Sequence, residues 1–111
     1  PVGDRMILVS DAMPTVAGPD AFDLYGQRIR LRDGRLVNGE GALAGAHVTM
    51  LESVRNVVQL LGRGLEEALR MSISHPAALM GREDLADIRK YPARDVILID
   101  NDLKSFEFPL E

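Results

Sequence analysis

A run of apolar residues near the start of the chain ends abruptly on two polar ones. Residues 6–9 read MILV, and Ser10 and Asp11 follow directly. A continuous apolar run is typical of a strand that is covered on both faces, as in a parallel sheet. Such a strand needs parallel neighbours, and only one further run is of the same type, within DVILID at 95–100. Because the strand count does not balance, we expect the chain to be the last part of a larger α/β protein.

The stretches between these two runs predict a hairpin and then helices. Arginine and apolar residues alternate over 28–32, and the turn signal Asp33-Gly34 follows, which predicts a β-hairpin over 27–38 with one solvated face. The arginines are interpreted as that solvated face, with anion binding as the less favoured alternative. Apolar residues at helical spacing predict helices, and SFEF near the end predicts a further strand. The predicted helices cover residues 49–61, 65–74 and 76–80.

Composition excludes several classes of function. The 111 residues carry 13 basic and 17 acidic side chains, a net charge of −4, and form no basic cluster, so we expect no nucleic-acid partner. No apolar run approaches membrane-spanning length and no signal peptide is recognisable, so we expect no membrane partner and a cytoplasmic location. Cysteine is absent, which excludes disulfides and thiolate metal sites. The two histidines, His47 and His75, lie far apart, so a metal site built from this chain alone would depend on carboxylates.

Asp11 is the leading candidate for chemistry. In parallel α/β folds, reactive groups gather at the carboxyl ends of the strands, where a carboxylate can act as a general acid or base. The pattern alone favours the alternative that Asp11 caps the following loop or hydrogen-bonds a turn. Asp100 ends the second apolar run in the same way, in LIDND, and nothing in the spacing separates the two aspartates.

A glycine-rich segment, GALAGA at 41–46, is the second candidate. Small residues let a ligand approach the backbone closely, although a flexible connector is the reading that the pattern favours. The segment lacks the strand–turn–helix fingerprint of phosphate-binding loops. His47 follows it, and a surface or capping role is favoured over a ligand role. A structural role at a helix entry is favoured for His75, which precedes Pro76.

Three stretches, taken together, resemble a known family. They are LVSDAM (8–13), GALAGAHVTMLESVRNVV (41–58) and LEEALRMSISHPAALMG (65–81). In this order they resemble the C-terminal part of the N-acetylglucosamine-6-phosphate deacetylases of the amidohydrolase superfamily. The family pattern has V-[ST]-D-A at a strand end, a hairpin insert, L-[AS]-G-S-x-L-T-M before a helix, N-P-A-x-x-x-G, and a last strand A-D-[LIV]-V-x-x-D. The chain departs from it at Ala46 (serine in the family), His75 (asparagine) and Arg94 (alanine).

The resemblance implies a fold class and a domain organisation. The chain would be the C-terminal fragment of a metal-dependent (β/α)8 barrel with returning strands of a small β-sandwich. Residues 1–94 would supply the last barrel strand (5–10), the hairpin insert (27–38) and the last helices. Residues 95–111 would supply the sandwich strands. The missing barrel strands would then explain the unbalanced strand count.

The resemblance also implies an activity, hydrolysis of the acetamide of N-acetylglucosamine 6-phosphate to glucosamine 6-phosphate and acetate. Asp11 would be the general acid/base and would reach the metal through its bound water. Backbone groups of Leu43, Ala44 and Gly45 would contact the amino sugar phosphate. The cofactor would be a divalent metal ion, zinc first and Fe, Mn or Co as alternatives, with its main ligands outside this chain. The intact protein would be a homodimer, and the 111 residues alone would be inactive.

Two alternatives remain open at this point. The same scaffold could carry another amidohydrolase reaction, such as a deaminase or a cyclic-amide hydrolase, although the match over 43–50 argues against it. The chain could also be a catalytically incomplete fragment whose unpaired sheet edges associate with a second copy.

Overall fold

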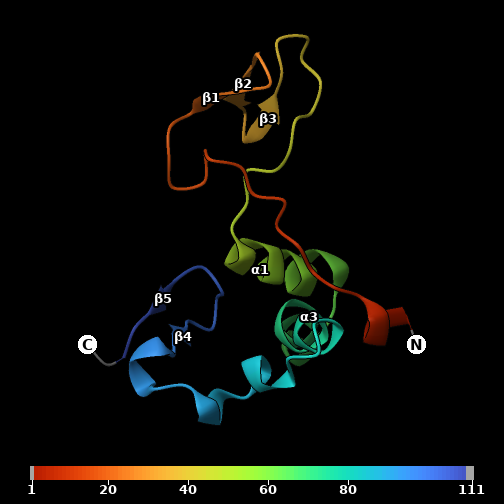
Figure 1. Cartoon of the computed structure of the whole chain (residues 1–111), viewed down its shortest axis with the longest axis vertical. Coiled ribbons are helices and arrows are strands. Elements are labelled where there is room, and N and C mark those ends of the chain that lie inside the picture. Colours follow the sequence, from red (N-terminus) through yellow and green to blue (C-terminus); the bar gives the residue numbers. More distant parts are fainter. Residues whose placement is uncertain (1, 110–111) are drawn as a thin grey trace. The chain divides into compact units, whose positions relative to one another are not determined.

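The computed structural model describes residues 2–109, which form a mixed α/β structure in two compact units. One unit is Ser10–Thr49, and the other combines Pro1–Val9 with Met50–Glu111. Their elements are labelled in Figure 1. Residues 1, 110 and 111, which the predicted barrel and sandwich segments include, lie outside the described residues.

The Ser10–Thr49 unit contains a three-stranded antiparallel sheet in the order β1-β2-β3. Both of its connections are two-residue turns, Tyr25–Gly26 and Asp33–Gly34, and all four residues have positive φ. Positive φ at both central positions defines the type I′ turn, whose twist matches that of the flanking strands, and Asp-Gly favours it. The hairpin therefore lies where the alternation predicts it. The strands are β1 (Ala21–Leu24), β2 (Gln27–Arg32) and β3 (Arg35–Val37).

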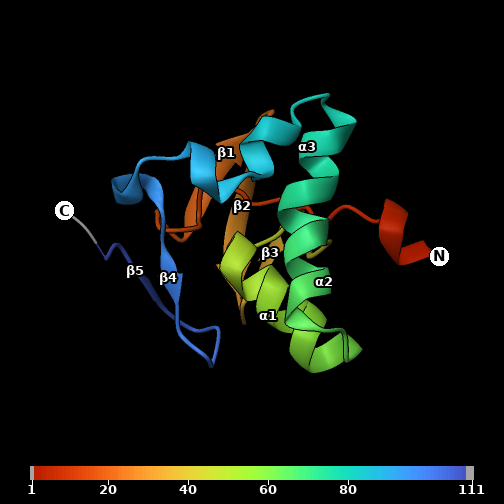
Figure 2. The same cartoon turned by 90° about the horizontal axis from the view of Figure 1, so that it is seen from below.

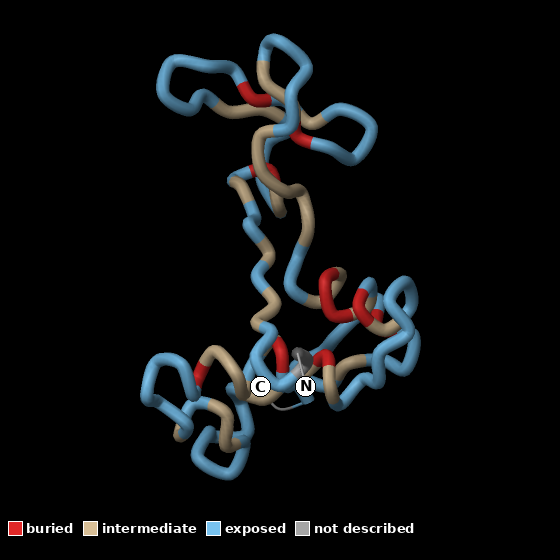
Figure 3. Tube along the Cα trace, turned by 90° about the vertical axis from the view of Figure 1, so that its right-hand side faces the viewer, coloured by how far each residue is buried: buried red, intermediate tan, exposed pale blue. Residues whose placement is uncertain are grey.

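One face of this sheet is buried and the other carries charge. Ile29 is 3% exposed and Leu36 is 0% exposed, whereas the arginines that alternate with Ile29 and Leu31 on β2 are exposed. Figure 3 colours the chain by burial and shows that its buried stretches are short and separated by exposed ones. Since the side-chain period of a strand is two, this separation of faces fixes the register of β2 against β3.

Leu36→Ala is expected to destabilise this unit by about 2–5 kcal/mol, because it removes a fully buried side chain and leaves a cavity. Amide hydrogen exchange of β2 and β3 measures the change. Leu43→Ala is the matched control, since Leu43 is 73% exposed, and it should leave exchange in β2 and β3 nearly unchanged. Equal exchange rates in the two variants would contradict the assigned core.

The second unit is built on two helical segments that pack side by side. After α1 (Met50–Leu61), the chain turns through Gly62, which has φ 66° as glycine commonly does after a helix. The next segment is one continuous helical segment, although the sequence predicted two helices (Figure 2). It consists of α2 (Leu65–Leu69), a π-helical turn (Arg70–Ser74) and α3 (His75–Leu79). Between residues 2 and 109, no helix combines the length and apolarity that a membrane span requires.

The apolar core of this unit lies between α1 and the continuous helical segment that begins with α2. Its members recur at three- and four-residue steps on each helix, which places them on one face. They are Val54, Val57, Ala68 and Met71, with Leu8, Val58 and Leu69 packed against them.

The π-helical turn has a cause in the sequence. The N–H of His75 donates to the carbonyl of Arg70, five residues back. In the same register the carbonyl of Met71 would need the N–H of residue 76, which is a proline and has none. The N–H of Leu8 donates to this Met71 carbonyl at 2.8 Å, so the helix defect becomes the attachment point of the N-terminal segment.

The predicted strand over 5–10 is absent from the structure, which corrects that prediction. Residues 6–10 have no strand pairing, and Val9 is 70% exposed rather than covered on both faces. The segment is attached through the Leu8 N–H and through the Met6 carbonyl, which lies 2.7 Å from Nδ1 of His75. The physical reason is that a parallel strand needs neighbouring strands, and none of the described residues supplies one.

The predicted buried strand over 95–100 is also corrected. Only Leu98–Ile99 forms a strand, β4, and it pairs antiparallel with β5 (Phe106–Glu107), whereas the apolar run predicted a parallel partner. Leu98 is 52% exposed. The run is apolar enough for burial, but Val96 and Ile99 are only half-buried and Ile97 and Leu98 are exposed.

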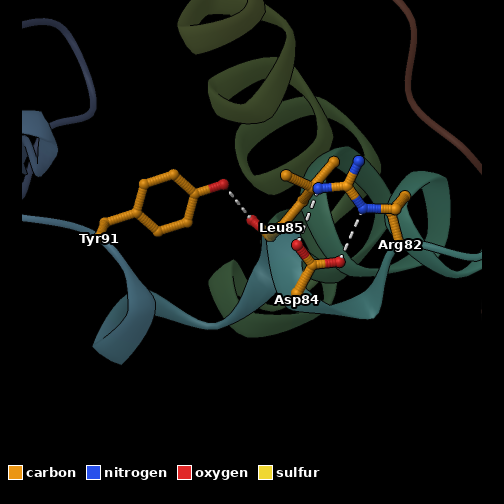
Figure 4. Close-up of polar contacts among 4 residues, drawn as sticks. All are labelled: Arg82, Asp84, Leu85 and Tyr91. Atoms are coloured by element: carbon orange, nitrogen blue, oxygen red, sulfur yellow. Dashed lines mark hydrogen bonds and ion pairs between the residues drawn. The ribbon is translucent and has the colours of Figure 1, made fainter.

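The connection between α3 and β4 forms short 3₁₀ turns that carry exposed ion pairs. Arg82 donates from Nε and Nη2 to the two carboxylate oxygens of Asp84, both at 2.9 Å, and the Tyr91 hydroxyl donates to the Leu85 carbonyl at 2.8 Å (Figure 4). The hydrogen bonds from Arg82 hold the pKa of Asp84 below its ordinary value. The turns are Glu83–Ala86, Ile88–Lys90 and Ala93–Asp95.

Arg82→Gln is expected to raise the pKa of Asp84 toward its ordinary value of 3.8. A carboxyl whose pKa is lowered by folding adds stability above its unfolded pKa, and that stability is lost as the pH falls through the folded pKa. In the unsubstituted chain, the turn that holds Arg82 and Asp84 should therefore loosen only below about pH 4. A carboxyl carbon NMR titration measures the pKa. Arg89→Gln is the control, because Arg89 pairs with Asp87, and it should leave Asp84 unchanged.

Candidate functional site

The structure brings the two sequence candidates, Asp11 and the glycine-rich segment, side by side. The N–H of Ala46 donates to the carbonyl of Asp11 at 3.1 Å, and the N–H of Met13 donates to the carbonyl of Ala46 at 3.2 Å. These bonds make Ala12 and Ala46 a parallel bridge. Residues 11–13 and 44–46 therefore form one short, backbone-paired site, although the hairpin separates them in the sequence.

The carboxylate of Asp11 is not used by the fold. Asp11 has φ 51°, a left-handed conformation that aspartate tolerates better than most residues, and its side chain is exposed. Within residues 2–109 this carboxylate has no hydrogen bond and no ion pair. The neighbouring Ser10 caps the local turn instead, because its Oγ accepts the N–H of Ala12 at 3.3 Å. The alternative that Asp11 serves as a turn cap therefore has no contact to support it.

Asp100, the second aspartate at the end of an apolar run, has a different environment. Its carboxylate accepts a hydrogen bond from the hydroxyl of Ser105. Its N–H donates to the Ser105 carbonyl at 3.1 Å, and its carbonyl accepts the N–H of Leu103 at 2.9 Å. Asp100 thus closes the turn between β4 and β5, so contacts separate two aspartates that the sequence could not.

The backbone of the glycine-rich segment is held from its other side by β3. The Ala44 N–H donates to the Leu36 carbonyl at 3.0 Å, and Leu43 lies opposite Val37 in an antiparallel bridge. The N–H and C=O groups of Leu43 and Gly45 make no backbone hydrogen bond to any described residue. The segment that Ala46 pairs with Asp11 therefore carries two pairs of main-chain groups without a backbone partner among the described residues.

Gly45 is required where it stands. Its φ is 95°, and a Cβ at this position would lie 2.6 Å from both Cγ and Cε of Met13. The Met13 side chain thus lies over the Cα of Gly45 and fills the space that a side chain would take. Met13 is a site residue that the sequence did not predict, since a methionine four residues after an apolar run gives no signal of a contact to residue 45.

Gly45→Ala is expected to destabilise the pairing of 11–13 with 44–46 by about 1–2 kcal/mol, because alanine is strained at positive φ and because Met13 must move. Hydrogen exchange of the Met13 and Ala46 amides measures this. The control is Gly39→Ala in the same loop, where a Cβ would meet nothing within 4 Å. An unchanged Ala46 amide in Gly45→Ala would contradict the assigned contact.

Both histidines have structural contacts. Nδ1 of His47 lies 3.0 Å from Oγ1 of Thr15, which is 2% exposed, so the pair ties the loop after Met13 to the segment after Ala46. His75 contacts the Met6 carbonyl, which is a structural role at a helix start. No cluster of three or more His, Cys, Asp or Glu that could hold a metal ion occurs within residues 2–109.

Comparisons with known proteins show what the chain resembles. No family model matches it. It is 34% identical over 85 residues to the N-acetylglucosamine-6-phosphate deacetylase of Haemophilus influenzae, covering 74% of this chain and 22% of that protein. It is 30% identical over 102 residues to an N-acetylgalactosamine-6-phosphate deacetylase of Escherichia coli, covering 90% of this chain and 27% of that protein. The chain thus spans about a quarter of the length of these relatives.

A solved structure agrees with the sequence relatives. The N-acetylglucosamine-6-phosphate deacetylase of Pasteurella multocida superimposes with a TM-score of 0.81 at 35% identity, over 91% of this chain and 27% of that one. The match extends over both sheet and helical segments, because it covers nine tenths of the residues.

Proposed function

Since the chain is related over most of its length to a part of the N-acetylhexosamine-6-phosphate deacetylases, we propose that it is the C-terminal segment of such an enzyme. The reaction is the hydrolysis of an acetamide on a phosphorylated amino sugar to the free amine and acetate. The observation that carries the proposal is the pairing of Asp11 with the open backbone of Leu43–Gly45 through Ala46.

Asp11 is proposed as the proton carrier. Hydrolysis of an amide requires a base that takes a proton from the attacking water and an acid that gives one to the departing nitrogen. One carboxylate can do both in sequence, because the proton that it takes from the water is the one that it gives to the departing nitrogen. The exposed carboxylate of Asp11, unbound by any described residue, supports this role, since a carboxylate used in a turn would be held in place by its donors.

Leu43, Ala44 and Gly45 are proposed to position the sugar. Leu43 is 73% exposed and Ala44 is small, and the N–H and C=O groups of Leu43 and Gly45 that have no backbone partner can donate to and accept from sugar hydroxyls. The Ala44 N–H is occupied by Leu36, which keeps this edge rigid. A rigid backbone edge beside the proton carrier favours one orientation of the amide.

A divalent metal ion is part of the proposed reaction, because such an ion polarises an amide carbonyl. The described residues do not form a site that fits one by themselves. Zinc, or Fe, Mn or Co, would be held by residues outside this chain, in a homodimer of the complete protein. The described residues contribute the proton carrier and the backbone edge.

The fold we propose is the end of a (β/α)8 barrel. Residues 5–10 form no strand in this chain, but they would lie where the missing barrel strands could pair with them; α1 to α3 would be the last helices, and residues 95–111 would join a small sandwich. The exposed Val9 and the backbone groups of 6–9 that have no strand neighbour support this, because parallel strands supplied by the rest of a protein would cover them.

A chimera tests the proposed function. In it, this chain replaces the matching segment of the Pasteurella multocida deacetylase, which supplies the remaining fold. The chimera should release acetate from N-acetylglucosamine 6-phosphate and lose activity when a chelator removes the metal. A chimera that folds, binds metal and hydrolyses only a cyclic amide or deaminates a base would support the other amidohydrolase reactions instead.

The epimer of the sugar is a separate question, because relatives of similar identity carry glucosamine and galactosamine names. We propose N-acetylglucosamine 6-phosphate as the first substrate and the galactosamine epimer as the second. The ratio of kcat/KM for the two substrates in the chimera, against the same ratio in the unmodified Pasteurella enzyme, measures what this chain contributes to the choice.

A further inference from the structure

The exposed face of the three-stranded sheet carries a row of arginines. Arg28, Arg30 and Arg32 occupy alternate positions of β2, so their side chains leave the same face, opposite Ile29 and Leu31. The register adds further neighbours to this face, because residues that pair directly across strands share a face. They are Ala21 and Asp23 from β1, and Arg35 and Val37 from β3.

The positive charge of this face is only partly neutralised. The Ser10–Thr49 unit has four arginines and five acidic residues, a net charge of −1, yet its arginines all lie on this face. Asp23 is the one acidic neighbour in register, and it lies 3.2 Å from Nη1 of Arg28. Arg30 and Arg32 make no ion pair with any described residue. Arg35 makes none either, so three guanidinium groups remain open to an external anion, and Arg30 and Arg32 are the two that line the cavity described next.

A cavity of about 460 Å³ lies over this face. Arg28, Arg30 and Arg32 line it together with Leu31, Val37 and the loop residues Asn38, Gly39 and Gly41. The loop is preorganised, because Oδ1 of Asn38 accepts the N–H groups of Glu40 at 3.0 Å and of Ala42 at 2.9 Å. A Cβ at Gly39 or Gly41 would meet nothing within 4 Å, so the space beside both glycines is open.

We propose that this cavity binds a small phosphate monoester, a second ligand site distinct from Asp11. A phosphate monoester carries a charge near −2 at neutral pH, which matches the two unpaired guanidiniums of Arg30 and Arg32. The planar fork of arginine donates two parallel hydrogen bonds to a phosphate, which lysine cannot do. Val37, which shares the face with the arginines, supplies apolar contact for the organic part, and the volume suits a ligand of monosaccharide size.

The site is tested by a binding titration that does not depend on deacetylation. Glucose 6-phosphate, inorganic phosphate and glucose are added to the isotope-labelled 111-residue chain, and amide NMR shifts are followed. We expect glucose 6-phosphate to shift residues of β2 and of the 38–41 loop, inorganic phosphate to bind more weakly, and glucose to cause no shift. Because glucose 6-phosphate has no acetamide, failure of this site and failure of the proposed activity are separate results.

Paired substitutions identify the arginines responsible. Arg30→Gln with Arg32→Gln should weaken binding of glucose 6-phosphate by about tenfold or more, since hydrogen bonds between charged groups are the stronger kind. Arg63→Gln with Arg70→Gln removes the same charge from arginines that already pair with Glu67 and Glu66, and should leave the affinity unchanged. If the glutamine pair disturbs the sheet, Arg30→Lys with Arg32→Lys keeps the charges and should weaken binding less.

Three results would overturn the site. The first is the absence of saturable shifts in β2 and the 38–41 loop with glucose 6-phosphate, in both the chain and the chimera. The second is equal weakening by the Arg63 and Arg70 pair, which would indicate general charge attraction. The third is equal affinity for inorganic phosphate and glucose 6-phosphate, which would mean that the cavity does not recognise the organic part.

Discussion

Asp11→Asn is expected to lower the rate of acetate release by the chimera by about two orders of magnitude or more, the usual contribution of a positioned general acid or base. Asparagine keeps the size of the side chain and its place at the end of residues 6–10, but it cannot carry the proton. Because no described residue bonds to the Asp11 carboxylate, the substitution removes no contact of the fold, and the loss should appear in kcat rather than in stability.

The matched control for this variant is Asp100→Asn. Asp100 also follows an apolar run, but its carboxylate accepts a hydrogen bond from Ser105 in a turn. Its substitution should loosen the β4–β5 turn and leave kcat near that of the unsubstituted chimera. Near-normal rates in Asp11→Asn, or equal losses in both variants, would remove the reason for assigning proton transfer to position 11.

The 111-residue chain alone, supplied with zinc, is expected to show no turnover of N-acetylglucosamine 6-phosphate, whereas the chimera turns it over. Residues 2–109 provide a proton carrier and a backbone edge but no cluster of metal ligands. Without a polarising group, a carboxylate by itself leaves the amide carbonyl poorly activated. Acetate release in the presence of zinc, cobalt or manganese measures the difference.

The remaining part of the Pasteurella enzyme, expressed separately and mixed with this chain, provides the control. Restored turnover on mixing would show that the isolated chain is folded but incomplete. Light scattering on the chain alone distinguishes this from self-association through the exposed β4–β5 sheet and the 6–10 segment. Turnover by the chain alone would contradict the proposal that the metal ligands lie outside it.

Local signals predicted the elements whose partners lie close in the sequence. Asp33–Gly34 needs only its own backbone geometry to form a type I′ turn. The β2–β3 hairpin therefore depends only on the residues directly on either side of that turn. In the same way, apolar spacing predicted α1, whose buried Val54 and Val57 lie one turn apart. The π-helical turn was missed, because its cause, the missing N–H of Pro76, matters only when a second segment can use the freed carbonyl.

Elements that depend on distant partners could not be predicted. Residues 6–9 and 95–100 are apolar enough for buried strands, but a strand forms only where a neighbour completes its hydrogen bonds. In this chain the 6–8 segment bonds to a helix, and Leu98–Ile99 pairs with a neighbouring strand in the antiparallel direction. The sequence therefore indicates which structure these segments suit, and the presence of neighbouring strands decides whether they adopt it.

The candidate site divides in the same way. Asp11 and Leu43–Gly45 were selected by pattern and resemblance, and their residue types carried the prediction. Their adjacency came from two backbone bonds at Ala46, which span the whole hairpin. The contrast between Asp11 and Asp100 came from a single hydroxyl, that of Ser105, and the need for glycine at 45 came from the Met13 side chain. Such contacts leave no periodic signal in a sequence.

A crystal structure of the chimera with glucosamine 6-phosphate and zinc tests the central claim most directly. We predict that a carboxylate oxygen of Asp11 lies about 2.6–3.2 Å from the amine nitrogen of the sugar, the distance that proton transfer requires. Backbone groups of Leu43 or Gly45 should lie within hydrogen-bond distance of the same molecule. An Asp11 carboxylate turned away from the sugar, or bonded to protein donors instead, would contradict the account.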